Sequence, residues 1–469
     1  MQAQAFQLDA AIAVRRKPSR LWLFIGDRLT RSRLRFTAAS TIVVASLLLA
    51  LSFATTSNNR TANGRGLGSD YLAFYDAGTI LNQHGLDRLY DLNLQSQLYH
   101  AHLPGEPEHA SLPYANAPFF AAMLRPLALL SYAWSYATWT SLSLLLFAGA
   151  FVLVWKTSGL PEKHRTFGLL VALSFEPFLI ECLHGGQISA FGLIWISLAI
   201  YYGKLGRQWA AGLALSVCVY KPTLLPLILP MLLIMRQWRT LGGFAIGTAL
   251  LALVSLVAVG PNACIDYLRM LAGYVGKSTA AGGGGFQTHK FIDLNSFLKL
   301  IGIPSMIAWA MLACVGAMVL RSVWLGRPKD NESAQRLLPI AWAAAITWTL
   351  VLNVYVGVYD SVLVIPAVVL TCGALLRRAN DTGRNLPLRL RCLLLALWVL
   401  PWFSGLIARD YGVQPFTIAL LALGVYQLNL LQRRAMQPAV VTRGHVAHRE
   451  SDLELFSPLA AEAASPAVR

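Results

Sequence analysis

The sequence has few charged residues for its length. They make up 13% of its 469 residues, whereas average soluble domains contain about 25%. Hydrophobic residues make up 56%, and the mean hydropathy is +0.53. Apolar runs of membrane-spanning length recur from Phe36 to Leu431. The composition therefore excludes a soluble protein and predicts an all-α, polytopic membrane protein.

Cysteine is also scarce. Six cysteines fall mostly within or at the ends of apolar runs, and no two are spaced as Cys-x-x-Cys. Neither a disulfide framework nor a cysteine metal site is expected. The four histidines of a long polar segment, residues 55–116, lack a compact ligand spacing. We therefore expect no metal and no cofactor.

Acidic residues are outnumbered by basic ones. There are 22 Asp and Glu against 39 Lys and Arg, for a formal net charge of +17. The Lys and Arg residues concentrate in short loops between apolar runs, which is the positive-inside pattern. An anionic inner leaflet is therefore the expected partner, and nucleic acid is not.

No cleavable signal peptide is evident before the first apolar run. A basic leader, residues 1–35, precedes a span from Phe36 to Ala54 that is long enough to remain as an anchor. Placing every basic loop inside gives about twelve spans over residues 36–432, with both termini in the cytoplasm. The segment 117–130 is short and broken by Arg125-Pro126, so we expect it to enter and leave from the outer side.

The less basic junctions all fall outside under this count. The first outer loop, residues 55–116, predicts two amphipathic helices, at about 71–84 and 91–102, lying on the outer surface. A glycine-rich outer loop is expected over residues 260–299, and a disordered cytoplasmic tail over residues 433–469. The polar residues at these outer junctions are Asp70, residues 184–187, Lys221, residues 293–295, Asp360 and Asp410.

Asp70 stands just beyond the first span, with helix-spaced aromatics at Tyr71, Phe74 and Tyr75 behind it. Two interpretations stay open from this stretch alone. A side-chain oxygen of Asp70 caps the helix that follows. Alternatively, the carboxylate is a general base for a hydroxyl acceptor held where the bilayer meets water.

Several short motifs follow one another in a fixed order. They are Asp70-Tyr71, Phe74 to Gly78, Leu89-Tyr90-Asp91, Tyr114 with Pro118-Phe119, Arg125-Pro126-Leu127, Gly186-Gln187, Ala211-Gly212, Lys221-Pro222, Asn295-Ser296 and Tyr359-Asp360. In this order and spacing the chain resembles the family-87 glycosyltransferases over about residues 66–375.

That resemblance implies a GT-C-type enzyme of the plasma (inner) membrane. Such an enzyme moves a sugar, often mannose or arabinofuranose, from a polyprenyl-phosphate donor to a lipid or glycan acceptor on the extracytoplasmic face. The resemblance also implies that Asp70 is the general base. Because one well-placed carboxylate is evident, we expect a single displacement that inverts the anomeric centre.

The departing phosphate calls for a fixed cation. Lys221 interrupts an apolar stretch between two short spans and is the leading candidate; its alternative role is a snorkelling lysine at a helix end. Arg125 follows the same logic, with an interfacial anchor as its alternative. Asp360 is expected to be either a site residue or the ion partner of Lys221.

The other candidates for substrate binding are polar residues near the outer ends of spans. Gln187 can hydrogen-bond sugar hydroxyls, and Asp76 is expected to be structural, holding Asp70 in place. Glu176 and Glu181 lie in a predicted span with no assigned role. The remaining candidates are Tyr75, Asn295, His289 and Lys290.

One alternative function is a transporter or flippase of lipid-linked sugars, which would also have broken helices and intramembrane charges. Such proteins often contain internal repeats, and the two halves of this sequence show no convincing similarity. A scaffold without chemistry leaves the clustering of polar residues on one face unexplained. The transferase is therefore the favoured prediction.

Overall fold

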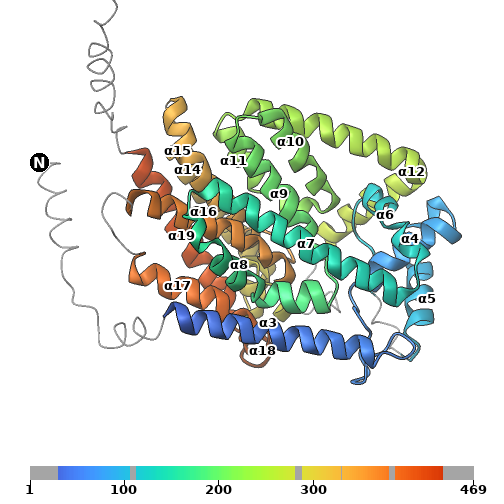
Figure 1. Ribbon diagram of the computed structural model, residues 1–469. Helices are drawn as coiled ribbons and strands as arrows, with labels where there is room; N and C mark the ends of the chain where they lie inside the picture. Colours follow the sequence, from blue (N-terminus) through green and yellow to red (C-terminus); the bar gives the residue numbers. More distant parts are fainter. Residues whose placement is uncertain (1–29, 106–111, 280–287, 329, 380–385, 437–469) are drawn as a thin grey trace, which may run out of the picture.

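The computed structural model describes residues 30–105, 112–279, 288–328, 330–379 and 386–436, and all regular elements in these ranges are helices. This confirms the all-α prediction. Three long helices, α3, α7 and α12, run in a similar direction, with α3 along one edge of the molecule and α12 along the opposite edge (Figure 1). The elements used below are α3 (Arg31–Ala54), α4 (Leu72–Gln83), α5 (Leu92–His102), α6 (Pro118–Leu124), α7 (Tyr132–Ser158), α8 (Arg165–Leu173), the π-helix η5 (Pro177–His184), α9 (Ser189–Lys204), α10 (Gln208–Ser216), α11 (Ile228–Ile234), α12 (Trp238–Thr279), η8 (Thr288–Lys290), α13 (Leu294–Leu300), α14 (Ser305–Leu325), α15 (Asn331–Val351), η9 (Val358–Leu363), α16 (Val364–Ala379), α17 (Leu388–Val399), α18 (Pro401–Tyr411) and α19 (Pro415–Ala435).

Local sequence signals set several helix ends. The Asp91 carboxylate accepts hydrogen bonds from the backbone N–H groups of Asn93 and Leu94 and so caps α5. The helix α7 ends at Gly159, whose φ of 75° is the left-handed conformation that glycine adopts readily. Asp330 and Ser333 form a reciprocal capping box that starts α15.

Six of the described helices are long and apolar enough to cross a membrane, or eight segments if each of two bent helix pairs is one span. The chain is therefore a multi-pass membrane protein, but the expected twelve spans are not confirmed. The observed number of spans is smaller than the expected number partly because α9, α10 and α11 are each too short to cross a membrane. The re-entrant segment is not confirmed either; α6 and a short turn at Leu127–Leu129 lie there.

The expected loop over residues 260–299 is largely helical. The helix α12 bends at Gly260, where φ is 81°, and continues to Thr279. Glycine tolerates this backbone conformation, and Pro261 is suited to the first turn of the helix that follows, so the chain resumes the helix beyond the bend. The four glycines at 282–285 lie outside the described residues, as do residues 1–29 and the tail from 437.

The two helices predicted in the first outer loop are confirmed as α4 and α5, but α4 does not lie on a surface. Its side chains Leu72, Phe74 and Asp76 are buried, and it packs against α5 and α6. Gly78 explains this close approach, because a Cβ atom there would lie 2.9 Å from the carbonyl oxygen of Leu124 in α6. The prediction of an interfacial helix was therefore wrong for α4.

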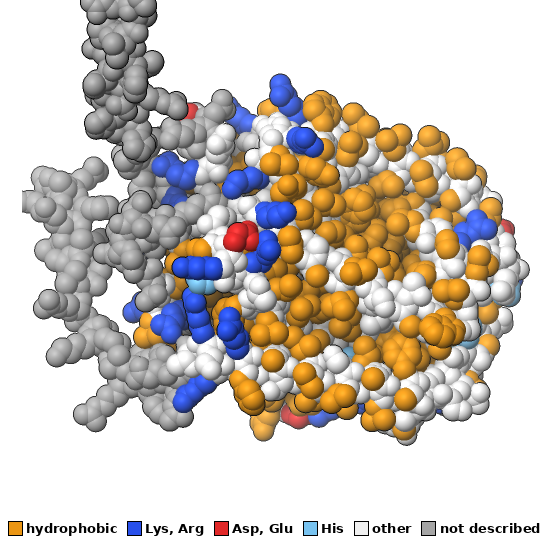
Figure 2. Space-filling model, viewed as in Figure 1, with side chains coloured by type: hydrophobic (Ala, Val, Ile, Leu, Met, Phe, Trp, Pro, Cys, Tyr) orange, Lys and Arg blue, Asp and Glu red, His pale blue; other side chains and the backbone are white. Residues whose placement is uncertain are grey.

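The two ends of the molecule differ in charge. Lys and Arg side chains gather at the left of Figure 2, the end at which α3 begins, and hydrophobic side chains cover much of the face beside them. The helices α4, α5 and α6 lie at the opposite end in Figure 1. Exposed apolar residues such as Val257 and Met306, at 79% and 84% exposure, suit a lipid environment.

Candidate active site

A short segment between the π-helix η5 and α9, residues 183–189, organises the site. The Tyr136 hydroxyl, from α7, donates to the carbonyls of Leu183 and His184 at 2.5 and 2.8 Å, and Trp139 Nε1 donates to the Gly186 carbonyl at 3.1 Å. The segment is thus fixed to α7 from one side.

Asp70 is attached to the other side of this segment. The backbone N–H groups of Asp70 and Tyr71 donate to the Gly185 carbonyl at 3.0 and 3.1 Å. At Gly186 φ is 80°, and a Cβ atom would lie 2.5 Å from Tyr71 Cβ, so this position requires glycine. The glycine pair therefore sets where Asp70 stands.

The Asp70 carboxylate points at Gln187, whose Nε2 donates to Oδ2 at 2.8 Å. The residue at the N-cap of α4 is Tyr71, and that end has no side-chain cap bond, so the capping interpretation of Asp70 is wrong. Burial raises the pKa of Asp70 above its ordinary value, and the hydrogen bond from Gln187 and the charge of Lys290 oppose that rise. The carboxylate therefore prefers to hold a proton more than an exposed aspartate does.

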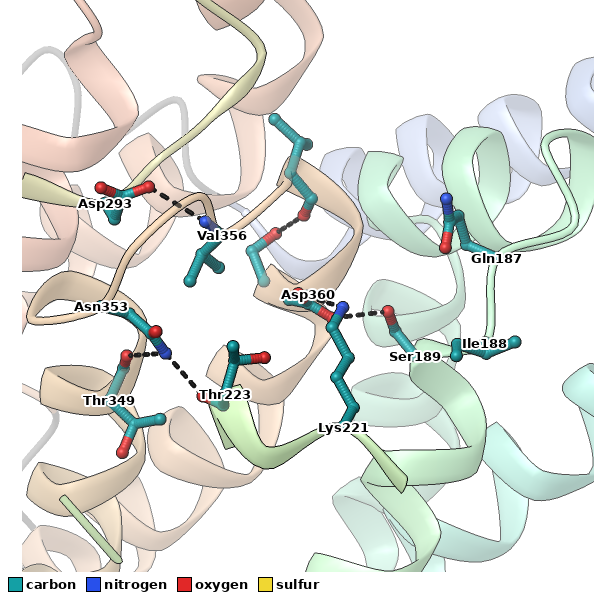
Figure 3. A network of polar contacts seen from close by, with 12 residues as sticks. Gln187, Ile188, Ser189, Lys221, Thr223, Asp293, Thr349, Asn353, Val356 and Asp360 are labelled. Carbon is teal, nitrogen blue, oxygen red and sulfur yellow. Dashed lines mark hydrogen bonds and ion pairs between the residues drawn. The ribbon is translucent and has the colours of Figure 1, made fainter. Parts of the chain in front are cut away.

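Lys221 and Asp360 form an ion pair on the far side of the segment (Figure 3). Lys221 Nζ donates to the two Asp360 carboxylate oxygens at 2.8 and 2.6 Å, and Ser189 Oγ donates to Oδ1 at 3.0 Å. Nζ also lies 4.5 Å from the centre of the Tyr359 ring. The Asp360 side chain is 3% exposed and that of Lys221 is 19% exposed, so the lysine is the more accessible partner. The expected ion partnership is confirmed.

The segment joins these two groups. Gln187 contacts Asp70 and Ser189, two residues later, contacts Asp360. Four residues singled out from the sequence are therefore brought together although they are far apart along the chain: Asp70, Gln187, Lys221 and Asp360. Ser189 was not among the candidates; its position two residues after Gln187 of the Gly-Gln pair, at the start of a span, is the signal that could have found it.

A second set of contacts supports the Asp360 side. Asp293 accepts hydrogen bonds from the backbone N–H groups of Ser296 and Val356 at 2.8 and 3.0 Å, which joins α13 to the loop before η9. Asn353 Nδ2 donates to the Thr223 carbonyl at 2.5 Å and so joins the same loop to the residues after Lys221 (Figure 3). Burial raises the pKa of Asp293 to about 6, and its hydrogen bonds oppose that rise.

Asp76 and Tyr75 lie in a different set of contacts. Asp76 Oδ1 is 3.2 Å from His102 Nδ1, and the Tyr75 ring meets the His102 ring edge-on with centres 5.5 Å apart. These contacts join α4 to α5. The expected contact between Asp76 and Asp70 is replaced by this pairing with His102.

The remaining candidates make no contact with the Lys221–Asp360 ion pair among the hydrogen bonds of the described residues. Arg125 is exposed, and its Nε donates to Asn82 at 2.9 Å. Lys290 is exposed and acts electrostatically on Asp70, and the carbonyl of the adjacent His289 accepts from Gln414. Asn295 is fully buried, and neither polar atom of its amide has a partner among the described residues.

No group of three His, Cys, Asp or Glu side chains in the described ranges could hold a metal ion. No curated protein and no solved structure matches the chain. The family model of glycosyltransferase family 87 matches residues 114–352, about half of the chain, and this range contains Gln187, Ser189 and Lys221. The chain therefore belongs to glycosyltransferase family 87 and is a membrane glycosyltransferase.

Proposed function

We propose that the enzyme transfers a sugar from a polyprenyl-phosphate donor to a hydroxyl of a lipid or glycan acceptor. The observation that carries this proposal is the pairing, across residues 185–189, of a partly buried carboxylate with an accessible lysine. A carboxylate can take the proton of the acceptor, and a lysine can stabilise the phosphate that departs. An apolar, membrane-embedded fold suits a donor with a long hydrocarbon chain.

Asp70 is the proposed general base. Gln187 donates to Oδ2, and no described residue donates to Oδ1, so Oδ1 is available to the acceptor hydroxyl. The raised pKa makes the ionised carboxylate a stronger base than an exposed aspartate. Gln187 is uncharged, so it orients the carboxylate without cancelling its charge.

Lys221 is the proposed phosphate ligand. An ammonium group has three N–H donors. Asp360 accepts from Nζ through both of its oxygens, which holds the ammonium group in one place. A donor on the accessible side of Nζ can then reach a phosphate oxygen. Such a fixed cation stabilises charge that develops on the leaving group without having to reorganise during the reaction.

The proposed reaction is a single displacement. The acceptor oxygen forms a bond to the anomeric carbon as the bond to the phosphate oxygen breaks, and Asp70 takes the hydroxyl proton. Polyprenyl phosphate leaves, and the anomeric configuration inverts. The gathering of Lys and Arg at the opposite end supports an orientation with that end in the cytoplasm and Asp70 on the extracytoplasmic side.

The test replaces Asp70 with Asn, which keeps the shape of the side chain and removes the base. Transfer is measured in membranes supplied with a polyprenyl-phosphate sugar, and the expected loss is about 10²–10⁴-fold. Asp91→Asn is the matched control, because Asn at this half-buried helix cap preserves the cap. Full activity in a correctly inserted Asp70→Asn variant would refute the base assignment.

A further inference from the structure

One face of α7 carries four buried side chains that each have a polar group. They recur at the spacing of successive helical turns, so they lie on the same side of the helix. None is more than 6% exposed, and a polar group that is buried in this way needs a hydrogen-bond partner. The four residues, called the α7 stripe below, are Tyr132, Ser135, Tyr136 and Trp139.

Two members of the α7 stripe hold the chain around Asp70. The Tyr132 hydroxyl donates to the carbonyls of residues 67 and 68 at 2.6 and 2.9 Å. The hydroxyls of Ser135 and Tyr71 lie 2.7 Å apart. The backbone on both sides of the Asp70 carboxylate is therefore bonded to α7.

The other two members hold the segment that leads to Gln187. Tyr136 donates to the carbonyls of residues 183 and 184, and Trp139 donates to the carbonyl of residue 186. A single helix face thus bonds both the chain that carries the proposed base and the chain that carries its hydrogen-bond donor. A helix holds such a group of residues more precisely than a loop does.

The Tyr136 ring also separates the two segments. A Cβ atom on Gly68 would lie 2.4 Å from ring atom Cε2, and a Cβ atom on Gly186 would lie 3.2 Å from the same atom. Gly68 stands two residues before Asp70, and Gly186 stands one residue before Gln187. One edge of one ring therefore contacts both segments and sets how closely they approach.

Two further rings pack against Tyr136 and fix it in place. Phe53 of α3 stacks on it, with ring centres 5.3 Å apart and planes at 23°. The Tyr71 ring centre lies 5.8 Å away. The Tyr136 side chain is fully buried, so it cannot change position unless its neighbours also move.

We propose that the α7 stripe, with Tyr136 at its centre, positions the general base by setting the separation at which Gln187 Nε2 donates to Asp70 Oδ2. The inference rests on the proposed base role of Asp70. A misplacement of about 1 Å can cost on the order of 100-fold in rate. No hydrogen bond of the stripe reaches the Lys221–Asp360 ion pair in the described part of the chain, so donor binding should not depend on it.

The first test is Tyr136→Phe, which keeps the ring and removes the hydroxyl. The carbonyls of Leu183 and His184 then lose this donor, and the segment can shift away from Asp70. We expect kcat to fall by about 10- to 100-fold. KM for the polyprenyl-phosphate sugar should stay within about twofold of the parent value, because the Lys221 side of the site is unchanged.

Tyr114→Phe is the matched control. Tyr114 is also buried, and its hydroxyl donates to the Ala117 carbonyl at 2.9 Å. It makes no hydrogen bond or ring contact with residues 67–71 or 183–187 among those described. This variant should lose as much thermal stability in detergent as Tyr136→Phe and should keep the parent kcat. A parent kcat in Tyr136→Phe, or a fall in kcat as large in Tyr114→Phe, would overturn the inference.

A double variant shows whether Tyr136 acts through the bond between Gln187 and Asp70. In a Gln187→Met background that bond is absent, so adding Tyr136→Phe should lower kcat by less than it does in the parent. An equal fall in both backgrounds would show that Tyr136 acts elsewhere in the protein and would contradict the inference.

Trp139→Phe covers the case in which Tyr136→Phe does not insert into the membrane. It removes the donor to the Gly186 carbonyl, beside Gln187, and should also lower kcat at an unchanged KM. A parent kcat in Trp139→Phe would count against the stripe in the same way.

The two proposals fail separately. Full activity in Asp70→Asn refutes the base assignment. Loss of transfer in Asp70→Asn together with a parent kcat in Tyr136→Phe refutes the role of the α7 stripe alone.

Discussion

Asp70 and Asp360 lie on either side of residues 185–189, and the regions around them differ. Asp360 is almost fully buried and is bound by a lysine and a serine hydroxyl. Asp70 is partly buried, and the neutral Gln187 amide is its hydrogen-bond donor among the described side chains. The same side chain is thus neutralised in one region and left as a lone acceptor in the other.

This difference teaches that partners decide what a carboxylate can do. Asp360, with both oxygens on Lys221 Nζ, is suited to hold a cation in place. Asp70, whose pKa is raised by burial, is suited to take a proton. A site for transfer from a phosphate donor needs both properties, and the 185–189 segment keeps them apart by contacting one region through Gln187 and the other through Ser189.

The largest expected effect comes from removing the cation. Lys221→Met leaves Asp360 buried without its ion partner, which should destabilise the protein by about 3–5 kcal/mol and abolish transfer. Thermal unfolding in detergent and the transfer assay measure the two effects. The double variant Lys221→Met/Asp360→Asn removes the unpaired charge, so it should regain stability but not activity. Recovery of activity in the double variant would show that Lys221 serves Asp360 alone.

A smaller effect is expected on the Asp70 side. The Gln187 hydrogen bond favours the ionised form of Asp70 and lowers its pKa, so Gln187→Met should raise that pKa further. Asp70 would then stay protonated to higher pH, and the acid limb of the rate profile should move toward neutral pH. The pH dependence of kcat measures this shift. An unmoved acid limb would mean that Gln187 does not touch the ionised base.

The smallest effect is expected at Arg125, which is exposed and contacts Asn82 rather than either carboxylate region. Arg125→Ala should change stability by about 0.5 kcal/mol or less and should leave donor saturation near its parent value. Kinetic titration with the polyprenyl-phosphate sugar measures this directly. A large rise in KM would show that Arg125 contributes to donor binding, and would contradict the assignment of this role to Lys221 alone.

From the sequence, the Lys221–Asp360 pair was one of two alternatives for Asp360, for a physical reason. A charge within an apolar stretch is costly without a partner, and Asp360 lies at the end of another such stretch. The bond between Asp70 and Gln187 could not be predicted in the same way. It depends on the positive φ of Gly186 and on the hydroxyl of Tyr136 in α7, and these are tertiary features.

The fold was predicted at the level of class rather than of spans. The apolar composition was enough to indicate a helical membrane protein. Hydropathy alone could not show that α11 is helical over seven residues only, or that α12 resumes beyond Gly260. The burial of α4 depends on the contact of Gly78 with α6, and the spacing of apolar residues along a helix does not predict such a contact.

The central claim is that both carboxylate regions open to the same side of the membrane. Cysteines introduced at Ser69 and Thr223, one beside each region, can be tested in intact cells with a small charged thiol reagent, with Lys163→Cys at the basic end and the parent chain as controls. Ser69→Cys and Thr223→Cys should react from outside, and Lys163→Cys should react only after the membrane is opened. Reaction of Ser69→Cys and Thr223→Cys from opposite sides would contradict the account.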